Sequence, residues 1–110
     1  MTEEKRIRDA LLPVGLDVEN AGYSGENQTY IAFNFSSRGE NFADNEPQNE
    51  LFLIAVHLFA PMDVDITAFK DAIRNCLVAA GFTYPTIEDV SDDNVRHVVF
   101  ECEDERSLSL

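Results

Sequence analysis

The run LFLIAVHLFA, from Leu51 to Ala60, constrains the fold more than any other segment of this chain. Successive side chains of a β-strand point to opposite faces, and here both faces are apolar. Its two faces are Leu51, Leu53, Ala55, His57 and Phe59, and Phe52, Ile54, Val56 and Leu58. We therefore expect 49–60 to be a central strand, covered on both sides by helices or by another subunit. The run is far shorter than the ~20 residues of a membrane-spanning helix.

Two helices are predicted from apolar stripes at helical spacing. The first is short, with Ile7 and Leu11 on its stripe, and it ends at Pro13 and Gly15. The second begins after Asp63 or Asp65, either of which can cap it, and runs to about 80. Its stripe consists of Ile66, Phe69, Ile73, Cys76, Leu77 and Ala80. Gly81 is suited to end this helix in a left-handed conformation, after which Phe82 folds back on the last turn.

Further strands are expected over 17–20, 29–37, 83–90 and 95–103. Ile31, Phe33 and Phe35 alternate with smaller or polar residues, as in a strand with one buried face. A chain of 110 residues suits one domain. Hairpin-linked strands with helices between them predict a single α+β domain over 1–103, with a mostly antiparallel sheet and both helices packed on it. The final 104–110 is predicted to be a flexible tail.

The segment SSRGENFADNEPQNE, from Ser36 to Glu50, is polar and long for a connection between two strands. We expect a mobile hairpin loop at about 37–49, because long loops without secondary structure are usually functional or disordered. Phe42 is its one bulky apolar residue, and it either folds back over the sheet edge or docks on another chain. The candidate interaction residues are Arg38, Glu40, Phe42, Asp44 and Glu46.

Composition excludes several classes of function. The net charge of −13 disfavours binding to nucleic-acid backbones and to anionic membranes. The N-terminus is charged and has no apolar segment typical of a signal peptide, so we expect the protein to be cytosolic or assembled inside a cell. No phosphate-binding loop, nucleophile elbow or zinc-protease motif occurs, and we assign no catalytic residue and no cofactor.

Histidine and cysteine each occur twice. His57 and His97 could meet if their strands are neighbours, and with Glu101 they could bind a metal, but clustered ligands are normally required and we predict no metal site. Cys76 and Cys102 lack the spacing of a zinc site. We interpret them as small buried apolar residues.

The chain resembles the small tail-terminator or tail-completion proteins of long-tailed bacteriophages and prophages, which join the tail tube to the head. The resemblance covers roughly 7–103. It lies in the order of an amphipathic helix ending LLPVGLDV, a strand TYIAFNF, a loop with FADNE, the strand LFLIAVHLFA, a helix ending AAGF and a closing HVVFECE. Phe42, Asp44 and Glu46 match the aromatic and acidic cluster of the family loop, whereas Pro85 departs from the family pattern.

The resemblance implies a structural protein of the virion that forms a ring, usually of six subunits, on the end of the tail tube. Its partners are then further copies of itself, the tail-tube protein and the head connector, and DNA passes through without specific binding. It would be found in the host cytoplasm during assembly and at the head–tail junction of the virion. Two alternatives are an acidic inhibitor that mimics DNA, and another minor tail or connector component. We expect the acids to concentrate in turns, loop and tail, which disfavours a mimic.

Overall fold

The computed structural model describes residues 2–22, 25 and 28–108. Its elements follow the chain as α1 (Glu3–Leu11), a 3-10 turn (Leu12–Val14), β1 (Asp17–Asn20), β2 (Tyr30–Ala43), β3 (Glu46–Pro61), α2 (Thr67–Ala79), β4 (Thr86–Asp89) and β5 (Val95–Ser107). The protein is elongated, with extents of 54 × 25 × 23 Å. No helix within the described ranges is long and apolar enough to cross a membrane.

The strands form one sheet in the order β1-β2-β3-β5-β4. β1 runs parallel to β2, and the other neighbouring pairs are antiparallel. The predicted α+β class with a mostly antiparallel sheet is therefore confirmed. So is the central place of the apolar strand, which is part of β3 and pairs with β2 on one side and β5 on the other.

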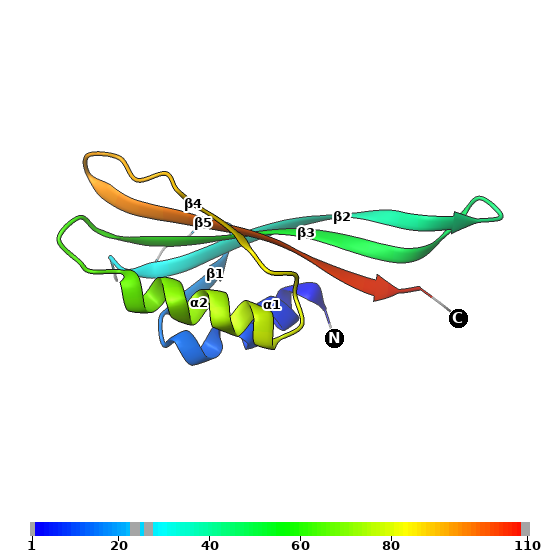
Figure 1. The fold of residues 1–110 in the computed structure, drawn as a ribbon, viewed down its shortest axis with the longest axis horizontal. Helices are drawn as coiled ribbons and strands as arrows, with labels where there is room; N and C mark the ends of the chain where they lie inside the picture. The colour runs from blue at the N-terminus through cyan, green and yellow to red at the C-terminus, as the bar shows by residue number, and fades with distance from the viewer. Residues whose placement is uncertain (1, 23–24, 26–27, 109–110) are drawn as a thin grey trace.

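Both helices lie against the same face of the sheet (Figure 1). We call it the core face. From the helices, Ile7, Leu11, Ile73 and Leu77 are fully buried in the core. From the sheet, the core includes Phe33, Val56, Leu58, Val98 and Phe100. Burying side chains of this size stabilises a fold by about 1.5–3 kcal/mol each.

Within the described part of the chain, no helix covers the other face of the sheet, which we call the open face (Figure 1). Along β3 the exposure alternates, so that Ile54, Val56 and Leu58 are buried while Ala55, His57 and Phe59 are only half-buried. The expectation of helices on both sides of β3 is thus wrong. Because this second face is also apolar, the other expected cover, another subunit, stays a prediction.

The ends of the helices follow their sequence signals. Thr2 caps α1 by accepting a hydrogen bond from the Lys5 N–H at 3.1 Å. Asp65 accepts one from the Thr67 N–H at 3.0 Å, but the N-cap of α2 is Ile66, so neither Asp63 nor Asp65 occupies the predicted capping position. Gly81 has a φ of 94°. The Phe82 N–H then donates to the Leu77 carbonyl and the Gly81 N–H to the Val78 carbonyl, which is the Schellman ending predicted for this helix.

Two predicted irregular segments are regular strand instead. β2 continues to Ala43 and β3 begins at Glu46, so the expected loop over 37–49 is reduced to a turn at Asp44 and Asn45. β5 likewise continues to Ser107, where 104–110 was expected to be a tail. In both segments the backbone N–H and C=O groups pair with β3. Such pairing does not depend on apolar side chains, so the polar sequence did not reveal it. Residues 109 and 110 lie outside the described part of the chain.

Candidate functional site: the three-stranded arm

One end of the sheet projects beyond the helices as a ribbon of three strands (Figure 1). We call it the arm and define it as 35–43 of β2, 46–54 of β3 and 102–107 of β5. β1 stops pairing with β2 at Phe33, and β4 stops pairing with β5 at Glu101. The outer edge of β2 is therefore no longer covered by β1 along the arm. On the other edge Thr83, which precedes β4, still bonds to the backbone of Glu103, so β5 lacks this neighbour only beyond Glu103.

The tip of the arm is a tight hairpin. Asp44 and Asn45 both have positive φ, 53° and 64°, which matches the right-handed twist of the strands that they join. Asn41 also has positive φ, 55°, and the register skips it between the pairs Glu40–Asn49 and Phe42–Pro47. Gln48 opposite is skipped as well, so the register is the same on both sides of this point and only the pairing is locally interrupted.

The five candidate residues are spread over this hairpin, with Arg38, Glu40 and Phe42 on β2, Asp44 in the turn and Glu46 at the start of β3. Arg38 and Glu40 form an ion pair, with the Arg38 Nε 2.7 Å from the Glu40 Oε1. Phe42 remains 65% exposed, although its ring lies over Gly39. Asp44 and Glu46 are exposed and, within the described residues, their carboxylates form no ion pair. The arm thus presents an unpaired aromatic ring and carboxylates at its tip.

The base of the arm is held to α1 by a cluster of four charged side chains. Arg6 donates from Nε and Nη2 to both oxygens of Asp104, at 2.6 and 3.1 Å. Arg106 donates to the Glu3 Oε1 at 3.0 Å and lies over the Phe52 ring. This cluster was missed from the sequence because Asp104 and Arg106 were interpreted as part of the tail. The available signal was their alternation with Glu103 and Glu105, since alternate residues of a strand lie on opposite faces.

The carboxyl of Glu3 is unusual because it is 4% exposed and faces Asp104. When it is ionised, its Oε2 has no hydrogen-bond donor among the described residues, whereas a protonated Glu3 can donate to Asp104. Burial, followed by the hydrogen bond to Asp104 and its charge, raises the pKa of Glu3 to about 7. Burial opposes ionisation of Asp104 too, but the hydrogen bonds from Arg6 and Glu3 outweigh it and lower the Asp104 pKa.

The open face carries a row of stacked rings close to the end opposite the arm. Tyr30, Phe59 and His97 lie side by side on β2, β3 and β5, with ring centroids 5.0 Å apart for the first pair and 4.2 Å for the second. His57 joins this row, because its Nδ1 lies 2.9 Å from the Nε2 of His97. The two histidines do meet, as the sequence allowed, since β3 and β5 are neighbours.

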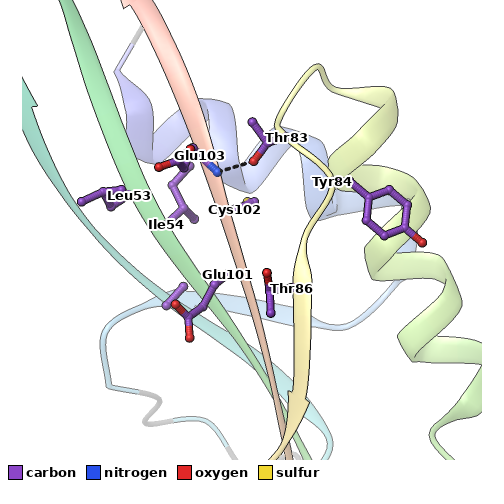
Figure 2. A pocket seen from close by; sticks show the side chains of 9 residues that line it. Leu53, Ile54, Thr83, Tyr84, Thr86, Glu101, Cys102 and Glu103 are labelled. Carbon is purple, nitrogen blue, oxygen red and sulfur yellow. Dashed lines mark hydrogen bonds between the residues drawn. The ribbon is translucent and has the colours of Figure 1, made fainter. Parts of the chain in front are cut away.

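A cleft of about 520 Å³ lies where the chain before β4 diverges from β5. Figure 2 shows Glu101, Glu103 and Thr86 around it, with the Glu103 N–H donating to the Thr83 hydroxyl oxygen at 2.8 Å and Tyr84 directed away. Burial, then nearby carboxylates, raise the pKa of the Cys102 thiol to about 12, so it is protonated at neutral pH and a poor nucleophile. The cleft therefore has the chemistry of a polar surface groove.

No family model matches the chain, and no curated protein is similar to it in sequence. Among solved structures with a similar fold, one superimposes with a TM-score of 0.65 over 97% of this chain and 91% of the other, at 13% sequence identity. Similarity at this level of identity shows that the two chains share a fold.

Proposed function

We propose that the protein is a structural component of a phage virion that caps the tail tube and joins the tail to the head as a homo-oligomeric ring. The observation that carries this proposal is the arm, a projection of paired strands with an exposed aromatic tip, whose β2 edge is no longer covered by β1. The resemblance described from the sequence gives the number of subunits as six and the role of the ring as the passage for DNA.

A ring needs two different patches that meet on successive copies. The outer edge of β2 and the outer edge of β5 lie on opposite sides of the arm. The Phe33 carbonyl accepts from the Ala21 N–H, so by alternation the backbone groups of 35, 37 and 39 point to the outer edge of β2. A strand of another chain can form hydrogen bonds with such a row of backbone groups.

Charge distinguishes the two edges of the arm. Arg38 is on β2, whereas Glu103 and Glu105 are on β5, and all three lie on the open face. Placed side by side, the β5 edge of one copy and the β2 edge of the next would bring opposite charges together. Complementary charges of this kind set the register and orientation of an interface more than its raw affinity.

The assembly test uses charge reversal on the arm. Arg38→Glu should abolish assembly on isolated tail tubes in electron micrographs, and Glu105→Lys in the same chain should restore it. Lys70→Glu, the same change of charge on α2, is the control and should assemble normally. Normal rings from Arg38→Glu, or no rings from the wild-type protein with tubes, would contradict the proposal.

The net charge of −13 suits a ring that DNA must cross, because carboxylates in the lumen repel phosphates and let the genome slide. Replacing Glu40, Asp44 and Glu46 by Lys should slow DNA ejection or leave DNA bound to the particle. Unchanged ejection kinetics would show that these acids do not face the DNA.

One observation supports the alternative of an acidic DNA mimic. Glu105 was expected in the tail, but it continues the strand of Glu101 and Glu103, so the three acids occupy alternate positions on β5 and form a row on one face, about 7 Å apart along the strand. A mimic would bind a basic DNA-binding protein in competition with duplex DNA. Arg38→Glu separates the two functions, because it should abolish tube capping and leave the binding of such a basic protein intact.

A further inference from the structure

We propose that His57 and His97 form a two-histidine site for a divalent transition-metal ion of the Cu²⁺ or Ni²⁺ type on the open face. The proposal is independent of the ring and of the arm. It rests on the relative placement of two imidazole nitrogens that come from neighbouring strands and from residues 40 apart in the chain.

The first argument is the distance between the nitrogens. His57 Nδ1 and His97 Nε2 are 2.9 Å apart. Two imidazole nitrogens bound to one metal at about 2.0–2.1 Å, with a right angle between the bonds, are separated by about 2.9 Å. Without a metal this contact is a hydrogen bond between the two rings, whose donor depends on their tautomers. When a metal replaces the shared proton, the nitrogens already have the spacing of adjacent ligands in a square-planar or octahedral site, the geometries in which Cu²⁺ and Ni²⁺ bind nitrogen and oxygen.

The second argument is that the surroundings hold both rings in place. His97 stacks on Phe59, which stacks on Tyr30, so the imidazole has an aromatic wall on one side. His57 contacts the Asn34 amide through Nε2, at 3.3 Å. With the metal on Nδ1, the His57 proton moves to Nε2, and the amide turns so that its oxygen accepts that proton. Such hydrogen bonds orient metal-bound histidines and fix their tautomer.

The third argument concerns the charge around the pair. Glu101 acts on His57, and Asp92 and Asp89 act on His97, all through negative charge that favours a cation.

The site supplies two protein ligands. Within the described residues no cluster of three or more histidine, cysteine, aspartate or glutamate side chains surrounds a common point. The remaining coordination positions of the metal are therefore occupied by water or by a group from another molecule. The class of ion follows from the ligands, because imidazole suits Cu²⁺, Ni²⁺ and Zn²⁺, of which Cu²⁺ binds most tightly.

The test is a titration of untagged protein with CuCl₂ at pH 7.5, followed by electron paramagnetic resonance. The chain contains only these two histidines, so nitrogen couplings from imidazole report on them alone. We expect one tightly bound Cu²⁺ with couplings from two imidazoles. His57→Gln and His97→Gln should each weaken binding at least tenfold and leave one imidazole coupling.

The controls separate this site from other ligands. Cys76→Ser removes the more exposed thiol and should leave both couplings unchanged. Glu88→Gln removes an exposed acid on β4 and should not change the affinity. A wild-type spectrum with couplings from one imidazole or none, or binding that survives both histidine substitutions, would overturn the proposal. The wild-type spectrum decides this even if a histidine variant fails to fold.

Discussion

Leu11 and Leu12 are adjacent in the sequence and identical in chemistry, but they lie in different environments. Leu11 is completely buried beneath the sheet, and Leu12 is 66% exposed at the start of the 3-10 turn. The hydrophobic effect acts on the area removed from water, so the two side chains contribute very differently to stability.

We therefore expect Leu11→Ala to lower the free energy of unfolding by about 2–5 kcal/mol, because it leaves a cavity in the core. Leu12→Ala should change it by less than about 0.5 kcal/mol. Urea denaturation followed by circular dichroism measures both. Equal losses for the two variants would contradict the orientation of α1.

Glu3 is the side chain whose ionisation state should most affect stability near neutral pH. Its pKa is raised to about 7, above the value of the unfolded chain. Its protonated form therefore contributes stability that is complete below about pH 4.5 and is lost as the pH rises through about 7. The histidines act in the opposite direction, because their lowered pKa values favour the folded state above pH 6.5.

Glu3→Gln isolates the contribution of this carboxyl, because the amide stays neutral and can still donate to Asp104. We expect the variant to gain at least about 1 kcal/mol of stability relative to the wild type between pH 5 and pH 8. Thermal unfolding at both pH values measures the difference. Glu4→Gln, on the exposed side of the same helix, is the control and should parallel the wild type. A parallel course for Glu3→Gln would show that Glu3 titrates normally.

At the scale of elements, the arm depends on the close approach of β2 and β3. A Cβ added at Gly39 would lie 2.7 Å from the Pro47 Cβ, well inside contact distance. The two side chains cannot both occupy this position without a shift of backbone, so Gly39 permits the pairing that carries the hairpin to its tip.

Gly39→Ala should destabilise the protein by about 1–3 kcal/mol through overpacking, or open the hairpin locally with a smaller global cost. Gly22→Ala is the control, because an added Cβ there meets no described atom within 4 Å. Nuclear magnetic resonance shifts of 38–48, together with the unfolding midpoint, distinguish the two outcomes. Wild-type shifts and stability in Gly39→Ala would show that the strands are further apart.

At the scale of the whole molecule, stability should fall along the length of the protein. The central part of β3 has β2 and β5 beside it and two helices beneath it, whereas the tip of the arm has only its hairpin partner. Local opening is easiest where buried apolar contacts are few.

Amide hydrogen exchange on the dilute free protein should show slow exchange over 52–60 and fast exchange over 39–49, with a gradient of at least about tenfold between them. Assembly with tail tubes should slow exchange over 39–49. Strong protection of this segment in the dilute protein would contradict the expectation that it gains order on assembly.

The sequence alone determined the elements whose patterns are strong and local. The stripe through Ile73 and Leu77, the ending at Gly81 and the alternation of Ile31 with Phe33 each report burial directly, so the helices, the α+β class and the central strand were predictable.

Only the tertiary structure decided where polar residues belong. Two largely polar segments are strand: 38–49, apart from its turn, and 104–107. Pairing with a neighbouring strand satisfies their backbone N–H and C=O groups whatever the side chains are. The same long-range pairing brought Glu3 to Asp104 and His57 to His97. Contacts of this kind depend on strand order and register, which no local pattern of residues records.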